Sequence, residues 1–157
     1  MQELKDRIVK EGKVLPGNII KVDGFLNHRI DTELMDHIAE EFGKHFNMDE
    51  VTMILTAEAS GIALSAIVAH HFHKPMIFAK KAKSDNIEGG LYQSDIFSYT
   101  YKKKVTLLVS KEWLSADDKV LIIDDFMANG EAMRGLCDIV NAARATLVGI
   151  GCAVEKG

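Results

Sequence analysis

The stretch VLIIDDFMANGEAMRG, residues 120–135, carries the pattern that decides the fold. Four apolar residues lead into two adjacent carboxylates, Asp124 and Asp125, and an Asn-Gly turn then precedes a segment with helical apolar spacing. A short apolar run that ends in polar residues and is followed by a helix is typical of a buried parallel strand. The stretch therefore predicts a strand, a turn and a helix, with both acids where the strand ends.

The rest of the chain repeats this order of strand and helix. Asp31 is placed to cap a helix, because apolar residues recur every four positions from Leu34 onward. The other predicted elements are strands at 51–56, 75–79 and 146–154 and helices at 61–72 and 129–143. Strands that alternate with helices predict an α/β domain with a parallel sheet flanked by helices.

Two segments depart from this rhythm. Residues 1–30 combine a short amphipathic helix at 2–11 with turn residues and a brief apolar strand, so we expect an N-terminal arm. Residues 80–104 are rich in Lys, Ser, Gly and Tyr, and they predict a flexible loop or hairpin. We interpret residues 1–157 as a single domain that includes both segments.

Composition narrows the classes of partner. The chain has 157 residues, of which 47% are hydrophobic, and a net charge of −4 that offers no broad cationic surface for nucleic acid or an anionic membrane. No apolar run reaches the length of a membrane span, and the charged start is unlike a signal peptide. With only two cysteines, we expect a cytoplasmic protein that binds a small molecule.

The adjacent acids and the turn behind them predict a ligand with two kinds of group. Ligands of parallel sheets bind beyond the carboxyl ends of the strands, where Asp124 and Asp125 are expected. Two neighbouring carboxylates require cations or hydroxyl donors, and a vicinal diol supplies such donors. Successive N–H groups of residues 128–132 at a helix start form a cradle for an anion. Ribose 5-phosphate carries both groups.

Other interpretations of these residues are weaker. The paired acids alone are consistent with an ordinary helix-capping turn, and a phosphorylated receiver domain also has paired acids at a strand end, although near its start. A Rossmann dehydrogenase is disfavoured because no G-x-G-x-x-G follows an early strand. The HHFH run at 70–73 has no suitably spaced carboxylate or cysteine, so a surface helix end explains it better than a metal site.

The segment IIDDFMANGEA, residues 122–132, resembles the PRPP-binding motif of the type I phosphoribosyltransferases. Asn129 and Ala132 stand where that family more commonly has hydroxyl residues, and this departure is similar to the bacterial xanthine phosphoribosyltransferases. The resemblance extends over most of the chain, through LKDRIVKEGKVLPGNIIKVDGFLNHRID (4–31), AEASGI (57–62) and GIGCAVEKG (149–157). It implies the type I phosphoribosyltransferase fold, with an incomplete hood because the family's C-terminal hood segment has no counterpart here.

The resemblance also implies a role for each matching residue. Asp124 and Asp125 would hold the ribose hydroxyls and serve catalysis. The residues implied to bind PRPP are Ala128, Asn129, Gly130, Glu131 and Ala132 at the 5-phosphate, Ala59, Ser60 and Gly61 at the pyrophosphate, and the cationic Lys80 and Lys81. The residues implied to contact the purine are Ile20, Asn27 and Lys156.

The implied activity is transfer of the 5-phosphoribosyl group from PRPP to xanthine, which gives XMP and pyrophosphate in purine salvage. Mg²⁺ would be bridged by pyrophosphate and ribose oxygens, with no protein ligand assigned to it. The resemblance further implies a homodimer. A PRPP-sensing regulator that keeps the fold without catalysis is the alternative, which is disfavoured because the first 15 residues are too short for a helix-turn-helix domain and the chain is net acidic.

Overall fold

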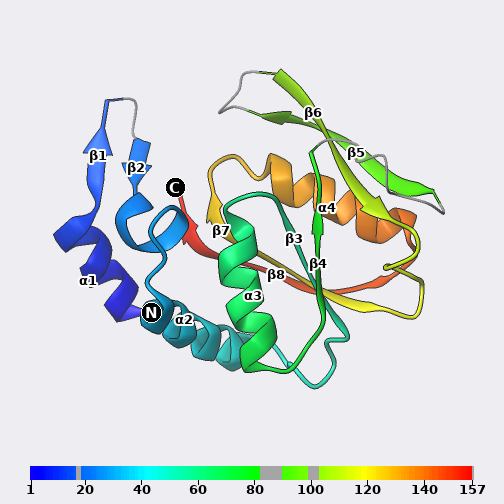
Figure 1. Ribbon diagram of the computed structural model, residues 1–157, viewed down its shortest axis with the longest axis horizontal. Coiled ribbons are helices and arrows are strands. Elements are labelled where there is room, and N and C mark those ends of the chain that lie inside the picture. The colour runs from blue at the N-terminus through cyan, green and yellow to red at the C-terminus, as the bar shows by residue number, and fades with distance from the viewer. Residues whose placement is uncertain (17–18, 82–89, 99–102, 157) are drawn as a thin grey trace.

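A four-stranded parallel sheet forms the centre of the computed structural model, which describes residues 1–16, 19–81, 90–98 and 103–156 (Figure 1). Its strands lie in the order β4-β3-β7-β8. Their bounds are β3 Met53–Ala57, β4 Met76–Ala79, β7 Lys119–Met127 and β8 Thr146–Glu155. The parallel sheet that the sequence predicts is confirmed, and β7, which carries the paired acids, lies inside it between β3 and β8.

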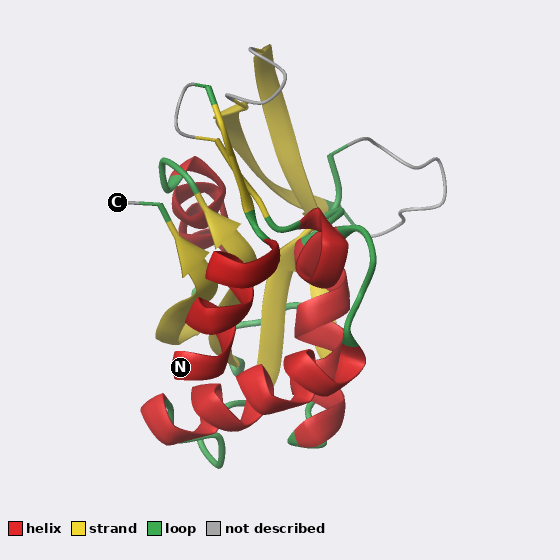
Figure 2. Ribbon diagram, turned by 90° about the vertical axis from the view of Figure 1, so that its left-hand side faces the viewer, coloured by secondary structure: helices red, strands yellow, loops and turns green. Residues whose placement is uncertain are grey.

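Helices and a separate hairpin cover the two faces of the sheet. Consecutive residues of a strand point to opposite faces, so Leu121 and Ile123 of β7 pack with α2 (Thr32–His45) and α3 (Gly61–His71). The intervening Val120 and Ile122 pack with α4 (Glu131–Ala142) and the antiparallel hairpin of β5 (Leu91–Ser98) and β6 (Lys103–Ser110). Figures 1 and 2 show this hairpin outside the parallel sheet, next to α4.

One sequence expectation about β7 is wrong. The strand does not end at the paired acids, because it runs on to Met127 and Asp124 is opposite Cys152 of β8. The pairing continues through Phe126 opposite Val154, so the length of β8 allows β7 to extend by two residues. Both acids are therefore held by the sheet ladder rather than by a loop.

The N-terminal arm is built on α2. It consists of α1 (Gln2–Glu11), the paired strands β1 (Lys13–Leu15) and β2 (Ile19–Lys21), and a π-helical turn, η1 (Asp23–Asn27). Arg7 of α1 bonds the Asp31 carboxylate at 2.6 Å, and Asp31 caps α2 by accepting from Leu34 N at 3.2 Å. The Leu34 N–H and the Arg7 guanidinium hold the pKa of Asp31 below its usual range. The predicted cap and arm helix are confirmed.

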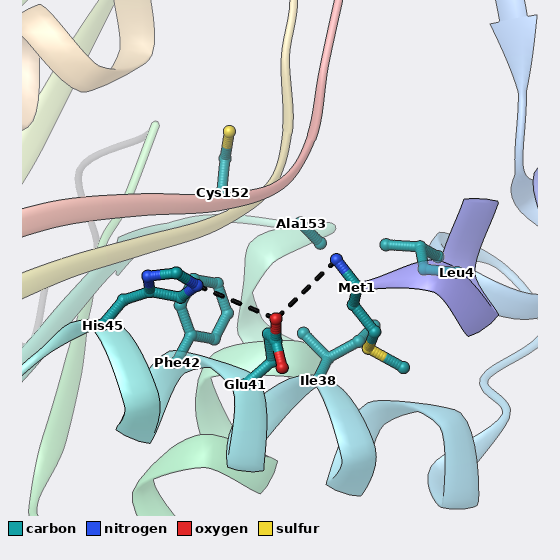
Figure 3. A pocket seen from close by; sticks show the side chains of 8 residues that line it. All are labelled: Met1, Leu4, Ile38, Glu41, Phe42, His45, Cys152 and Ala153. Atoms are coloured by element: carbon teal, nitrogen blue, oxygen red, sulfur yellow. Dashed lines mark ion pairs between the residues drawn. The ribbon is translucent and has the colours of Figure 1, made fainter.

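A small cavity marks the place where the arm, α2 and β8 meet. Its volume is about 180 Å³, and Met1, Glu41 and His45 lie around it with Ala153 of β8 (Figure 3). The Met1 ammonium and His45 Nε2 each lie 3.8 Å from Glu41 Oε1. The remaining lining residues are mostly apolar. This cavity is therefore best explained as the gap left where Met1 and α1 pack against α2 and β8.

The excursion that the sequence predicts at 80–104 is a hairpin over its described part. Lys80 joins the hairpin to β4, because its N donates to Leu108 O at 2.9 Å and its O accepts from Leu108 N at 2.8 Å. The expectation of a flexible loop falls largely on residues 82–89, which lie outside the described residues. Among the described residues, no helix is both long and apolar enough to cross a bilayer.

The glycines of β8 provide a test of this packing. A Cβ added to Gly151 would lie 2.5 Å from Phe42 Cε1, and therefore Gly151→Ala forces the aromatic rings that α2 packs against β8 to shift. We expect the free energy of unfolding to fall by about 1–3 kcal/mol, as in overpacked cores. Urea denaturation measures the change. Gly24→Ala is the matched control, since an added Cβ there meets nothing within 4 Å, and equal effects of both substitutions would contradict the packing described.

Candidate functional site

Asp125 is the most firmly held polar side chain of the site. The residue is 1% exposed, and its two carboxylate oxygens receive hydrogen bonds from two distant segments of the chain. Ser60 Oγ donates to Oδ1 at 2.8 Å, and Asn27 Nδ2 donates to Oδ2 at 3.0 Å. A buried carboxylate requires such donors, because it has lost the water that would otherwise solvate it. The Asp125 carboxylate therefore joins η1, the turn before α3 and the sheet at one point.

Asp124 is buried with much less support. Its Oδ1 accepts from Asp125 N at 2.9 Å, and the residue is 8% exposed. Burial, with a smaller contribution from the neighbouring Asp125 carboxyl, raises the pKa of Asp124 to about 8, while the positive charge of Lys81 opposes the shift. A carboxyl with this pKa is largely protonated at neutral pH. Asp124 therefore keeps hydrogen-bonding capacity that a hydroxyl-rich or cationic ligand can use.

Gly61 allows α3 to begin directly beside these groups. A Cβ at this position would collide with both Thr56 Oγ1 and Asp124 Oδ1. Thr56 lies in β3, and its hydroxyl is buried without a hydrogen-bond partner among the residues that the structure describes. The absence of a side chain at Gly61 thus lets the turn at 58–61 approach the acids closely.

The loop between β7 and α4 forms the wall of a cavity of about 200 Å³. The cavity is lined by residues 126–133 together with Asp124, Lys81, Ile96 and Phe97. Gly130 caps α4 with a φ of 73°, a left-handed conformation that favours glycine, and a Cβ there would meet nothing within 4 Å. The start of a 12-residue helix therefore opens into the cavity, as an anion cradle requires.

The Glu131 side chain connects the loop to the hairpin and to α4. Its Oε2 accepts from Phe97 N at 3.2 Å and from Arg134 Nη2 at 3.1 Å. Arg134 also donates to Asp95 O at 2.9 Å, which ties the hairpin to α4, and it lowers the pKa of Glu131. The Glu131 carboxylate is thus engaged by the hairpin and α4.

The structure brings together only some of the residues that the sequence singles out. Asn27, Ser60, Gly61 and both aspartates meet at the C-terminal end of the sheet, and Lys81 lines the same cavity as Asp124 and residues 128–132. Ala59 follows Glu58, whose Oε1 accepts from Lys81 N at 2.6 Å. Lys80 pairs through its main chain with Leu108, and Lys156 N donates to Met127 O at 2.9 Å. Ile20 packs against the core cluster that includes α2.

Sequence reasoning missed Thr56 and Phe97. Thr56 is a polar residue at the end of an apolar run, a signal that was available but weak without knowledge of Gly61 and Asp124. Phe97 lines the cavity from the hairpin and is 42% exposed, and nothing local to its sequence places it opposite α4. Both residues reach the site only through tertiary packing.

The acids are also the groups in this site that fit a metal ion. Carboxylate oxygens suit Mg²⁺, which is commonly held by one or two carboxylates together with phosphate oxygens of a substrate. Within the described residues, no three His, Cys, Asp or Glu side chains gather as a complete metal site. The donor set therefore fits a magnesium ion that arrives with an anionic ligand.

The raised pKa of Asp124 makes stability depend on pH. Between the ordinary pKa of 3.8 and about 8, the folded protein keeps a proton that the unfolded chain releases, so the free energy of unfolding falls as pH rises. Asp124→Asn removes this dependence. Relative to the unsubstituted protein, the variant should therefore gain stability with rising pH, by up to about 1.4 kcal/mol per pH unit within that interval.

Urea denaturation at several pH values from 5 to about 8 tests this linkage. Asp117→Asn serves as the control for the loss of one negative charge, because Asp117 lies exposed in the turn before β7. If the stability difference between Asp124→Asn and the unsubstituted protein stayed constant with pH, the burial argument for Asp124 would be wrong.

Comparison with known proteins assigns this arrangement to a family. A family model described as phosphoribosyl transferase domain matches residues 25–157. A xanthine phosphoribosyltransferase of Bifidobacterium adolescentis is 49% identical over 100% of this chain and 82% of its own length, and one of Lachnoclostridium phytofermentans is 52% identical over 100% and 81%. An adenine phosphoribosyltransferase structure from Saccharomyces cerevisiae has a TM-score of 0.78 at 16% identity, with 99% and 90% coverage, and supports the fold alone. The chain belongs to the phosphoribosyltransferase family and has its type I fold.

Proposed function

We propose that the chain is a purine-salvage enzyme, a pentosyl-transferring glycosyltransferase that moves the 5-phosphoribosyl group from PRPP to xanthine and releases XMP and pyrophosphate. The observation that carries this proposal is the cavity in which Asp124 and the open loop at 128–132 face one space. A diol and a phosphate on one ribose fit these two features together. The relatives at about half identity are named xanthine phosphoribosyltransferases, which supports xanthine as the acceptor.

Asp124 and Asp125 have different roles in binding the ribose. Asp125 already accepts from Ser60 and Asn27, so its position is set before the substrate arrives. Asp124 has fewer partners and is the better acceptor for the ribose hydroxyls once it loses its proton. The bond to pyrophosphate breaks at the anomeric carbon, which gains positive charge in the transition state, and the two carboxyl groups are positioned to stabilise that charge.

The turn before α3 and the end of β4 serve the pyrophosphate. Ala59, Ser60 and Gly61 lie at the start of α3, where unpaired N–H groups favour an anion. Lys81 lines the cavity and contributes a positive charge toward Asp124. Lys80 is bound to the hairpin through its main chain, so its part in binding PRPP would fall to its side chain. When bound with PRPP, Mg²⁺ would neutralise the leaving pyrophosphate. Carboxylate oxygens are preferred ligands of Mg²⁺, so Asp124 and Asp125 are the residues that would hold it.

Asn27, Lys156 and Ile20 are proposed to contact the purine. Asn27 donates one of its two amide N–H bonds to Asp125 Oδ2, so its Oδ1 can accept a hydrogen bond from the base. Lys156 follows β8, and its main chain is held at the end of β7. A donor-only lysine favours the 2-oxygen of xanthine and leaves the 2-amino group of guanine facing another donor. Ile20 of β2 is half-buried and would supply apolar contact.

The wider setting is proposed on the same basis. We propose that the enzyme is a cytoplasmic homodimer. Residues 1–30 and 80–104 would belong to its single domain and would lie next to the purine and the PRPP, respectively. The family and the named relatives support an enzyme over the PRPP-sensing regulator considered from the sequence. The net charge of −4 gives nucleic acid no broad surface.

Asp125→Asn tests the catalytic role. The substitution keeps the shape of the side chain but removes its negative charge, so turnover of xanthine with PRPP and Mg²⁺ should fall by about 100-fold or more. Formation of XMP at saturating substrate measures the loss, and far-UV circular dichroism confirms that the variant is folded. Asp117→Asn removes an exposed carboxylate and should leave turnover unchanged. Equal turnover in the Asp125 variant and the unsubstituted protein would refute the assignment.

Lys156→Ala tests the choice of base. We expect kcat/KM to rank xanthine above guanine and hypoxanthine, with adenine rejected, and the substitution to narrow the xanthine-to-guanine ratio by about tenfold, because one donor to the base is lost. The KM for PRPP should change little. Lys119→Ala, at the opposite end of the sheet, is the control. A base ranking that survives Lys156→Ala unchanged would remove Lys156 from the purine site.

A further inference from the structure

None of the roles above uses the buried hydroxyl of Thr56. The residue lies in β3 and is 0% exposed, and its Oγ1 has no hydrogen-bond partner among the residues that the structure describes. The other buried hydroxyls in that part of the chain are paired. Ser65 Oγ donates to Ile123 O at 3.3 Å, and Ser94 Oγ donates to Asp138 Oδ2 at 2.8 Å. An unpaired buried hydroxyl lowers the stability of a fold, so its presence in Thr56 points to a contact that forms in another state of the protein.

Gly61 brings this hydroxyl next to the carboxyl of Asp124. A Cβ at Gly61 would collide with both Thr56 Oγ1 and Asp124 Oδ1, so the two oxygens border one small space at the start of α3. Because glycine has no Cβ, residue 61 contributes no side-chain atom that would keep the two groups apart. Asp124 Oδ1 accepts from Asp125 N at 2.9 Å, and a carboxylate oxygen can accept a second hydrogen bond. The Thr56 hydroxyl therefore has an acceptor beside it that a small rotation of either side chain would bring into reach.

Thr56 can act on a ligand only through this neighbour. Its side chain is fully buried and is not among the residues that line the cavity beside the loop at 128–132, whereas Asp124 is one of them. Within the described residues, the Asp124 carboxyl receives one hydrogen bond, while that of Asp125 receives two from distant side chains. A carboxyl with one bond is less firmly oriented than a carboxyl with two, and a second donor at Oδ1 would fix the orientation of Asp124.

We propose that Thr56 is a positioning residue, whose hydroxyl donates a hydrogen bond to Asp124 Oδ1 when PRPP occupies the cavity. The inference rests on the proposed function, because it takes the ribose hydroxyls as the groups that Asp124 holds. With Oδ1 bound by Thr56 and by the Asp125 N–H, Oδ2 is directed to the ribose. The hydroxyl is then unpaired in the free protein and paired in the complex, so its burial costs stability before binding and strengthens binding afterwards.

Two substitutions separate the hydroxyl from the shape of the side chain. Thr56→Val keeps the branched shape and removes the hydroxyl, whereas Thr56→Ser keeps the hydroxyl and removes a methyl group. Isothermal titration calorimetry of the whole chain with PRPP and Mg²⁺, without xanthine, measures binding. We expect Thr56→Val to weaken PRPP binding by about tenfold and Thr56→Ser to stay within about twofold of the unsubstituted protein. Thr146→Val, at the exposed start of β8, is the matched control and should leave binding unchanged.

Stability should rank the two variants in the opposite order. Thr56→Val removes an unpaired buried hydroxyl and should be at least as resistant to urea as the unsubstituted protein, whereas Thr56→Ser leaves a methyl-sized cavity and should be less resistant. In turnover of xanthine, Thr56→Val should raise the KM for PRPP by about tenfold with kcat little changed, because the hydrogen bond is present in both the ground state and the transition state. A purely structural role would instead make PRPP affinity and stability fall together.

Equal PRPP binding by the Thr56→Val and Thr56→Ser variants would overturn the proposal, and so would a Thr56→Val variant that loses stability and PRPP affinity together. Calorimetry requires no turnover, so these outcomes hold even if xanthine is not the acceptor. Failure of the proposed function appears in the unsubstituted protein, as absent PRPP binding or absent XMP. Failure of the Thr56 inference appears in the comparison of the two variants.

Discussion

The hydrogen-bonded burial of the Asp125 carboxylate is the constraint around which the site is organised. Its donors, Ser60 and Asn27, come from the turn before α3 and from η1, which are far apart in the sequence. An unpaired carboxylate at 1% exposure would cost several kcal/mol, on the order of the whole stability of a domain. The turn before α3 and η1 must therefore assemble with the sheet if this carboxylate is to be buried with its hydrogen bonds made.

Close packing around Asp124 is the complement of that interaction. Gly61 and Thr56 lie beside the Asp124 carboxyl but supply no positive charge to it. The burial that raises the pKa of Asp124 therefore lowers the stability of the folded protein at neutral pH. A site that holds a poorly solvated acid gains strong interactions with a ligand that supplies hydroxyl groups or a cation. The proposed substrate, PRPP with Mg²⁺, supplies both, so the cost to stability and the proposed function have the same physical origin.

The hairpin extends the site beyond the parallel sheet. Two contacts attach it, the Lys80 and Leu108 pairing at the end of β4 and the Arg134 and Glu131 bonds from the start of α4. Both attachments lie next to residues proposed to bind anions. One face of the hairpin packs on α4 through Ile96 and Leu107, and the alternate residues of the same strands face away from that core, so a single pair of strands serves both the core and the surface.

The sequence by itself determined the order of the elements, the parallel sheet, the cap at Asp31 and the turn that leads from β7 into α4, because apolar periodicity and turn chemistry are local properties. It placed the end of β7 too early, since the extension to Met127 depends on pairing with β8. Only the tertiary structure decided that Ser60 and Asn27 hold Asp125, that Thr56 adjoins Gly61, and that Lys81 lines the cavity beside Asp124. Except for the contact of Thr56 with Gly61, these contacts cross long stretches of chain, and no local pattern encodes which distant side chains meet when the faces of a sheet are covered.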